Sequence, residues 1–244
     1  MGKIIVITSG KGGVGKSTAS VGIATALCTG GKKVLLIDTD EGLRCLDMLL
    51  NVSNRLVFDM SDVINGGADF TESLLKVPGI SNLYLLAASN RRESVSKAKL
   101  ADLIIKSSNE FDYVIVDSPA GTDMKLNSCL PNTTEFFVVC NTDPVCLRDA
   151  VQMSLLLSEI SIWDAKLIIN RFDYKLAKKQ NFCVDSLIDT SGIMLSGIVP
   201  EDIMVQEILG QGKPFVFGNA SRAFYRIAAR IDGDFIPLPN LKKL

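Results

Sequence analysis

Histidine is absent from the 244 residues of this chain, and no cysteine belongs to a C-x-x-C pair. A zinc site needs several well-spaced thiolate, imidazole or carboxylate ligands, so this composition argues against structural zinc. We expect the thiols to stay reduced and to pack as small apolar groups, as is usual in the cytoplasm. The cysteines are Cys28, Cys45, Cys129, Cys140, Cys146 and Cys183.

Long apolar runs and a strong net charge are also missing. No run approaches the roughly 18 residues of a membrane-spanning helix. The net charge is −1, whereas nucleic-acid-binding proteins usually carry a strongly basic face. The sequence enters a strand pattern at Lys3, which leaves no room for a signal peptide. We therefore expect a cytoplasmic protein with no nucleic-acid partner.

The sequence instead alternates short β-branched runs with longer helical stretches. Such alternation predicts βαβ units and a mainly parallel sheet. We predict a single α/β domain over residues 1–244, with about seven or eight strands flanked by helices on both faces and a short tail at 234–244. The expected strands are 3–9, 33–38, 82–86, 113–117, 136–140, 166–170 and 196–199, and the expected helices are 16–29, 59–65, 97–107, 148–160, 184–190, 202–209 and 221–231.

A glycine-rich loop follows the first expected strand and opens the first expected helix, and it fits the phosphate-binding pattern G-x-x-x-x-G-K-[ST]. Glycines let backbone N–H groups approach phosphate oxygens, and the helix N-terminus adds partial positive charge. We expect Lys16 to neutralise the β- and γ-phosphates of ATP and Ser17 to ligate Mg²⁺. The sequence thus predicts a P-loop NTPase. The expected nucleotide-binding residues of the loop are Gly10, Lys11, Gly12, Gly13, Val14, Gly15, Lys16, Ser17 and Thr18.

Carboxylates end two further expected strands. Asp38 and Asp40 point to the same side, because side chains alternate along a strand. Asp117 closes an apolar strand in the manner of a Walker B motif. The carboxyl ends of parallel strands face the ligand crevice of an open α/β sheet, so we expect Asp117 to help hold Mg²⁺ through a water molecule.

The second lysine of the loop carries further information. With Lys11 preceding Gly12-Gly13-Val14-Gly15-Lys16, the loop resembles the deviant Walker A loop of the MinD/ParA ATPase family. The resemblance extends from about residue 3 to about residue 232. It implies an ATP-dependent homodimer in which Lys11 contacts the nucleotide of the partner subunit, in a role similar to an arginine finger.

Two segments resemble the nucleotide-sensing switches of this family. The acidic pair and the following G-L-R-x-L-D stretch, which starts at Gly42 and Leu43, resemble the first switch. This implies that Asp40 orients the attacking water while Asp38 supports the Mg²⁺ shell. The run D-S-P-A-G at 117–121 resembles the second switch of the MinD branch, and it implies that the backbone N–H of Gly121 meets the γ-phosphate.

Three further segments are similar to the family's contacts with the nucleoside. The resemblance assigns Asn170 to the adenine edge and Arg171 to stacking on the adenine plane. Pro200 and Asp202 lie in a turn that the family has beside the base, and Asp143 resembles an acidic residue that reaches the nucleotide across the dimer. A turn or helix-cap role would explain each of these residues equally well.

The resemblance implies a Mg²⁺-dependent switch in division-site placement that hydrolyses ATP to ADP and phosphate. The implied partners are a second copy of the chain, a MinC-like inhibitor or an activating protein, and the inner face of the cell membrane. Pro237 and Pro239 leave only about one helical turn at residues 241–244. We therefore expect no clear amphipathic membrane helix and at most a weak peripheral membrane contact.

Four other functions share parts of this pattern. A ParA-like DNA-partitioning ATPase has the same loop but binds DNA through basic surface residues. A flagellar-number regulator of the MinD type tends to carry an N-terminal glutamine-bearing extension. An iron–sulfur carrier needs cysteines at a dimer axis or a C-terminal C-x-x-C, and Cys129 lacks a convincing partner. The pair Asp38 and Asp40 argues against a nucleotide sensor that does not hydrolyse ATP.

Overall fold

The computed structural model describes residues 1–41, 44–89, 95–121, 123–143, 145–209, 211, 213 and 217–243. Apolar, β-branched runs form its strands, and the predicted alternation of strands and helices is confirmed. The strands are β1 Lys3–Thr8, β2 Val34–Asp38, β3 Leu75–Lys76, β4 Leu83–Leu86, β5 Tyr113–Asp117, β6 Glu135–Cys140, β7 Lys166–Phe172 and β8 Met194–Pro200.

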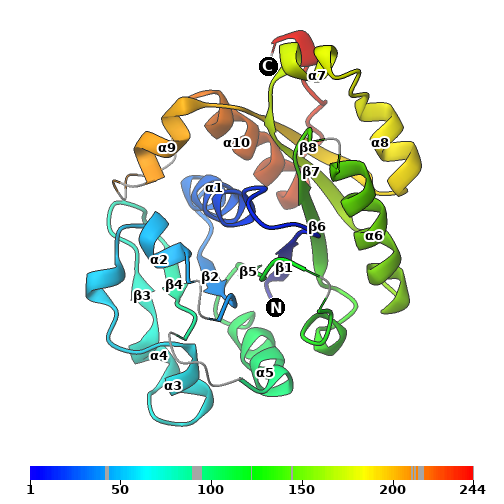
Figure 1. Cartoon of the computed structure of the whole chain (residues 1–244). Coiled ribbons are helices and arrows are strands. Elements are labelled where there is room, and N and C mark those ends of the chain that lie inside the picture. Colours follow the sequence, from blue (N-terminus) through cyan, green and yellow to red (C-terminus); the bar gives the residue numbers. More distant parts are fainter. Residues whose placement is uncertain are drawn as a thin grey trace.

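Among the described residues, eight strands form one sheet in the order β3-β4-β2-β5-β1-β6-β7-β8 (Figure 1). Every neighbouring pair is parallel except β3 with β4. Parallel neighbours need crossover connections, and helices supply them here. The order places β1 at the centre of the sheet, so the loop that follows it opens between the ends of its neighbours β5 and β6.

Side chains alternate between two apolar layers, one on each face of the sheet. Ile5 and Ile7 of β1 belong to the layer under α1 (Lys16–Thr29) and α10 (Asn219–Asp232). Ile4 and Val6 belong to the opposite layer. The main helices of that second layer are α5 Lys97–Ser107, α6 Cys146–Glu159 and α8 Val184–Ser191, and α3 Met60–Ile64 packs at its margin.

Several short elements lie where the sequence gives no periodic signal. The antiparallel strand β3 has two residues and, among the described strands, pairs with β4 alone. The helices α2 (Leu46–Leu49), α4 (Phe70–Ser73) and α7 (Tyr174–Lys179) have four to six residues. A hydrophobic repeat needs a window of more than ten residues, so segments this short escape it. The remaining helix, α9 (Ile203–Leu209), lies within the range expected from the sequence.

The segment after α10 lies against the body of the protein. Arg230 donates from Nε to the carbonyl of Ile236 at 2.7 Å and from Nη2 to that of Pro237 at 2.9 Å. Its Nη1 donates to the carbonyl of Ser196 in β8 at 2.7 Å. Leu241 then packs against the second apolar layer, and the last described residues lie beside α7 (Figure 1). Over the described residues, no helix has the length and apolar character that crossing a membrane requires.

Candidate nucleotide site

The glycine-rich loop connects the end of β1 to the start of α1. Gly13 and Gly15 have φ values of 78° and 93°, which favour glycine. A Cβ on Gly15 would lie 2.1 Å from Nδ2 of Asn170. That amide is buried and donates to the carbonyl of Val14 at 2.9 Å, so the end of β7 holds the loop in shape.

The backbone of this loop can accept an anion. Of the described residues, none accepts a hydrogen bond from the backbone N–H groups of residues 12–18. No acidic residue lies in the first turn of α1, and its N-cap residue is a glycine without a capping side chain. Free N–H groups at a helix N-terminus bind phosphate, because they are oriented donors at the positive end of the helix dipole. The cradle therefore fits the polyphosphate of a nucleotide.

Two carboxylates lie beside this cradle. Asp117 ends β5 and is the register partner of Asp38 at the end of β2. The hydroxyl of Ser20 donates to Oδ1 of Asp117 at 2.9 Å, and Ser17 also hydrogen-bonds to this carboxylate. Lys16 is buried and lowers the pKa of Asp117. A serine hydroxyl next to a strand-end aspartate is the donor set that P-loop proteins use for Mg²⁺, so these residues fit that ion.

Burial dominates the electrostatics of these acids. Desolvation raises the pKa of Asp117 to about 7, and the neighbouring charge of Asp38 adds to the rise. The pKa of Asp38 is also raised by burial, against three backbone hydrogen bonds that lower it. Burial raises the pKa of Asp40 as well, while Lys16 lowers it. A divalent cation would relieve all three groups.

Asp38 also organises the segment that follows β2. Its Oδ1 accepts from the backbone N–H of Asp40 at 3.0 Å, and its Oδ2 accepts from those of Cys45 at 3.0 Å and Leu46 at 3.1 Å. The aspartate therefore caps α2 and holds the turn that carries the half-buried Asp40. The predicted motif residues Gly42 and Leu43 lie outside the described residues.

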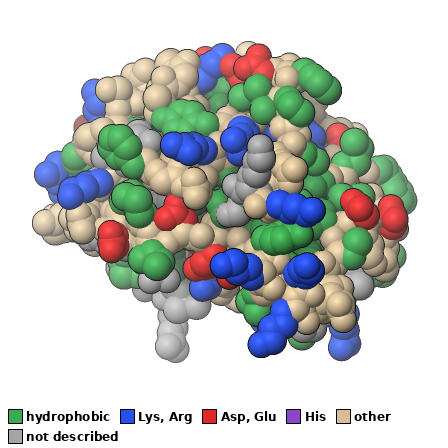
Figure 2. All heavy atoms as spheres, turned by 90° about the horizontal axis from the view of Figure 1, so that it is seen from above, with side chains coloured by type: hydrophobic (Ala, Val, Ile, Leu, Met, Phe, Trp, Pro, Cys, Tyr) green, Lys and Arg blue, Asp and Glu red, His purple; other side chains and the backbone are tan. Residues whose placement is uncertain are grey.

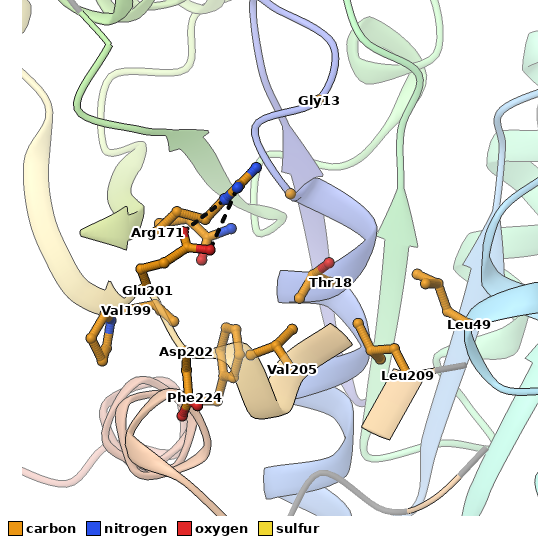
Figure 3. A pocket seen from close by; sticks show the side chains of 13 residues that line it. Gly13, Thr18, Leu49, Arg171, Val199, Glu201, Asp202, Val205, Leu209 and Phe224 are labelled. Atoms are coloured by element: carbon orange, nitrogen blue, oxygen red, sulfur yellow. Dashed lines mark hydrogen bonds and ion pairs between the residues drawn. The ribbon is translucent and has the colours of Figure 1, made fainter. Parts of the chain in front are cut away.

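A cavity of about 340 Å³ adjoins the loop on the side of β7 and β8. Figure 3 shows Arg171 and Glu201 pointing toward each other at one end and Thr18 projecting from α1 into the middle. The guanidinium Nε of Arg171 lies 2.8 Å from Oε2 of Glu201. The residues that line the cavity are Gly13, Gly15, Thr18, Leu49, Asn170, Arg171, Val199, Pro200, Glu201, Asp202, Val205, Leu209 and Phe224.

Sequence reasoning assigned four of these lining residues to the nucleoside, and the structure brings them together. Three of them also have a second task in the protein. The side chain of Asn170 holds the loop, and the side chain of Arg171 forms an ion pair with Glu201. The backbone of Arg171 lies in the left-handed region, with a φ of 55°. Asp202 accepts from the backbone N–H of Met204 and of Ala220, each at 3.1 Å, and so links the starts of α9 and α10.

Lys11 and Asp143 meet within the same chain. Nζ of Lys11 lies 3.1 Å from Oδ2 of Asp143, and both side chains remain more than one third exposed. The backbone N–H of Gly121 donates to the carbonyl of Ser9 at 3.1 Å, which fixes the second predicted switch against the loop. The early lysine and the second switch therefore flank the phosphate cradle.

Several residues of this site were not assigned by the sequence reasoning. Ser20 lies one helical turn beyond the loop motif, and Phe224 comes from the distant helix α10. Glu201 lies in the turn that the resemblance places beside the base, but its ion pair with Arg171 was not predicted. The position of Ser20, three residues after Ser17 on the same helix face, could have indicated it. No sequence signal connects Phe224 with the loop.

Comparison with known proteins identifies the family of the chain. The model of the CobQ/CobB/MinD/ParA nucleotide-binding domain matches residues 5–215. The chain belongs to this family. It is 36% identical to the septum site-determining protein MinD of Bacillus subtilis over 251 aligned residues, which cover 100% of this chain and 94% of that protein.

Solved structures of family members superpose over nearly the whole chain. MinD of Aquifex aeolicus has 34% identity and a TM-score of 0.86, and it covers 98% of this chain and 100% of its own. MinD in the MinC:MinD complex of the same organism has 36% identity, a TM-score of 0.88 and 98% coverage of both chains. MinD of Pyrococcus horikoshii, complexed with Mg-ADP, has 26% identity and a TM-score of 0.82, with 96% and 97% coverage. The predicted P-loop fold and the MinD resemblance are confirmed.

Proposed function

We propose that this chain is a Mg²⁺-dependent ATPase that switches between a monomer and an ATP-bound dimer and acts in division-site placement. The observation that carries the proposal is the phosphate cradle with two lysines, Lys16 inside it and Lys11 at its exposed rim. A solvated loop lysine would explain Lys11 alone, but not its position beside Asp143 at the mouth of the cradle. The similarity to MinD proteins supports the division-site role.

The residues of the cradle divide the work. Bound Mg·ATP supplies a γ-phosphoryl group whose transfer depends mainly on positioning and on neutralised charge. Lys16 and the backbone N–H groups of the loop carry the positive charge that this group needs. Ser17 and Asp117 would hold the metal ion, and Asp38 would support them. Asp40, half-buried and next to Lys16, is the carboxylate that orients the attacking water.

Lys11 and Asp143 are the proposed contacts to the second copy of the chain. Both side chains are exposed, and each can change partner at small energetic cost because an exposed ion pair is largely screened by water. In the proposed dimer Lys11 leaves Asp143 and completes the partner's site. Asn170, Arg171, Pro200 and Asp202 line the cavity that would hold the adenosine.

A MinC-like inhibitor or an activating protein is the proposed partner, and the inner face of the membrane is a second, weaker one. The solved MinC:MinD complex supports the protein partner.

The membrane contact would use the exposed lysines of α7 and the adjacent tail, namely Lys175, Lys178, Lys179 and Lys242. Figure 2 looks onto the top of the molecule in Figure 1, where Lys and Arg side chains lie beside apolar ones and are interrupted by acidic ones. This mixture favours a weak lipid contact over a nucleic-acid site.

Gel filtration with Mg·ATP tests the switch. We expect the wild type to elute as a dimer with ATP and as a monomer with ADP. Asp40→Ala should trap the ATP dimer because hydrolysis is blocked, and Lys11→Ala should remain monomeric. Lys99→Ala, an exposed lysine on α5, is the control that should behave as the wild type. An Asp40→Ala protein that never forms an ATP dimer would contradict the switch.

Sedimentation with anionic vesicles tests the membrane contact, and a DNA mobility shift over a series of salt concentrations tests the absence of a nucleic-acid partner. We expect ATP-dependent pelleting of the wild type and no salt-dependent DNA shift. A protein that stays in the supernatant would be a soluble regulator acting on its protein partner alone.

A further inference from the structure

An ion pair links the first predicted switch to the start of helix α5. Nζ of Lys97, the first residue of α5, lies 3.0 Å from Oε1 of Glu41. Glu41 directly follows Asp40, the proposed water-orienting carboxylate. The two side chains are 30% and 21% exposed, so water screens their attraction less than it would at an open surface.

Lys97 also faces the second switch. Its side chain lines a narrow crevice together with Thr39, which follows β2, and with Gly121 and Asp123, which follow β5. The lysine therefore lies where the two switch segments meet, although it comes from neither. The position of α5 is fixed by packing, because Leu100 and Ile104 are fully buried in the second apolar layer.

The turn that carries Asp40 is held through its backbone and through one of its side chains. On the inner side Asp38 accepts from the backbone N–H of Asp40 at 3.0 Å. On the outer side Lys97 binds the carboxylate of the next residue, Glu41. The hydrogen bonds to Asp38 hold the backbone at Asp40, Cys45 and Leu46, and the ion pair adds a contact to the side chain of Glu41. Small displacements of a group that aligns a nucleophile lower the rate strongly.

We propose that Lys97 is a positioning residue for ATP hydrolysis, which acts through Glu41 to hold the Asp40 turn against the second switch. This inference rests on the proposed ATPase function and adds a residue outside the phosphate loop and the switches. Because Lys97 acts on the turn and does not line the cavity beside the loop, its removal should lower turnover and leave nucleotide binding almost unchanged.

Steady-state ATPase kinetics on the full chain test the role. We expect Lys97→Met and Glu41→Gln each to lower kcat by about tenfold and to change KM for ATP by less than about twofold. The double variant should be no slower than either single one, because the two groups act as a pair. Lys97→Arg keeps the charge and should retain kcat within about twofold. Lys99→Met, two positions along the same helix and exposed, is the control and should match the wild type.

Three results would overturn the role of Lys97 while the wild type remains an active ATPase. These are a wild-type kcat in Lys97→Met, losses that multiply in the double variant, and an ADP affinity that falls together with kcat. Thermal unfolding of each variant shows whether a loss reflects misfolding, in which case Lys97→Arg and Glu41→Gln decide. A wild type without nucleotide binding or turnover would instead overturn the proposed function itself.

Discussion

Asp38 and Asp117 are register partners at the ends of the neighbouring parallel strands β2 and β5, and both are almost completely buried. Two buried carboxylates at adjacent positions repel each other, and desolvation penalises the charge of each. The hydrogen bonds that the two carboxylates accept lower this cost only in part, because the pKa of each group is still raised. The arrangement is explained if Asp38 and Asp117 form part of a cation site, because a bound cation offsets the repulsion between their carboxylates.

Asp117→Asn should therefore stabilise the nucleotide-free protein at pH 8. The folded-state pKa of about 7 lies above the ordinary value near 3.9, so the unfolded chain releases this proton first. Between about pH 4 and pH 7 the folded state binds more protons than the unfolded state, and stability falls as the pH rises. The loss of unfolding free energy caused by ionised Asp117 reaches its full size above about pH 7 and amounts to at most about 4 kcal/mol.

Urea unfolding at pH 5 and pH 8, with and without Mg·ADP, measures this effect. The gain from Asp117→Asn should be larger at pH 8, and the variant should lose most of the stabilisation by Mg·ADP. Asp102→Asn, an exposed acid on α5, is the matched control and should show neither change. A variant that is destabilised equally at both pH values would show that Asp117 has a purely structural role.

The hydrogen bond from Asn170 to Val14 predicts a second effect. Asn170→Ala removes the buried donor that holds the loop and leaves space beside Gly15. We expect ADP affinity to fall by about tenfold, equivalent to one hydrogen bond of 1–1.5 kcal/mol. Titration of a fluorescent ADP analogue measures the affinity. Asn109→Ala, an exposed residue after α5, should bind as the wild type does, and an unchanged affinity in Asn170→Ala would contradict a loop-holding role.

The local chemistry of the loop could be predicted from the sequence, whereas contacts between distant segments could not. The loop, its preceding strand and its helix are contiguous, and positive φ at Gly13 and Gly15 follows from the glycines themselves. The strand-end position of Asp38 and Asp117 follows from apolar runs that end in an acid. Lengths of most long elements agree within a few residues because their hydrophobic patterns are complete.

The pairs Glu41 with Lys97 and Lys11 with Asp143 join residues 56 and 132 positions apart. No local pattern encodes such pairs, since they depend on the order of strands in the sheet. The same applies to Asn170, for which a resemblance suggests a contact with adenine and the folded chain adds a contact with Val14. Short helices such as α7 depend on a single cap, here Asp173, and not on periodicity.

The hydrogen bonds of Arg230 give a prediction about how readily the segment after α10 is cleaved by a protease. Its three hydrogen bonds to Ser196, Ile236 and Pro237 hold the chain after α10 against β8. Arg230→Met should release this segment and speed chymotrypsin cleavage after the exposed Phe235 by about tenfold, because a protease needs locally unfolded backbone. Mass spectrometry of timed digests measures the rate. Arg222→Met, exposed on the same helix, is the control, and equal rates in both variants would contradict the role of Arg230.

The packing of α1 on α10 gives the last prediction. A Cβ on Gly22 would lie 2.4 Å from the ring of Phe224, which is 1% exposed, so the ring would have to shift. Alanine favours helix by about 1 kcal/mol over glycine, but forcing an atom into a full core costs about 1–3 kcal/mol, so the overlap should win. Gly22→Ala should lower the urea midpoint without changing the slope.

The control for this change is Gly67→Ala, where the nearest atom to the new Cβ is the carbonyl oxygen of Asp62 at an ordinary 3.5 Å. It should leave the midpoint almost unchanged. A smaller side chain at position 224 should make room, so the double variant Gly22→Ala/Phe224→Leu should be more stable than the sum of its single changes predicts. Strict additivity would mean that the ring of Phe224 is not what excludes a side chain from Gly22, because only direct contact makes the two effects depend on each other.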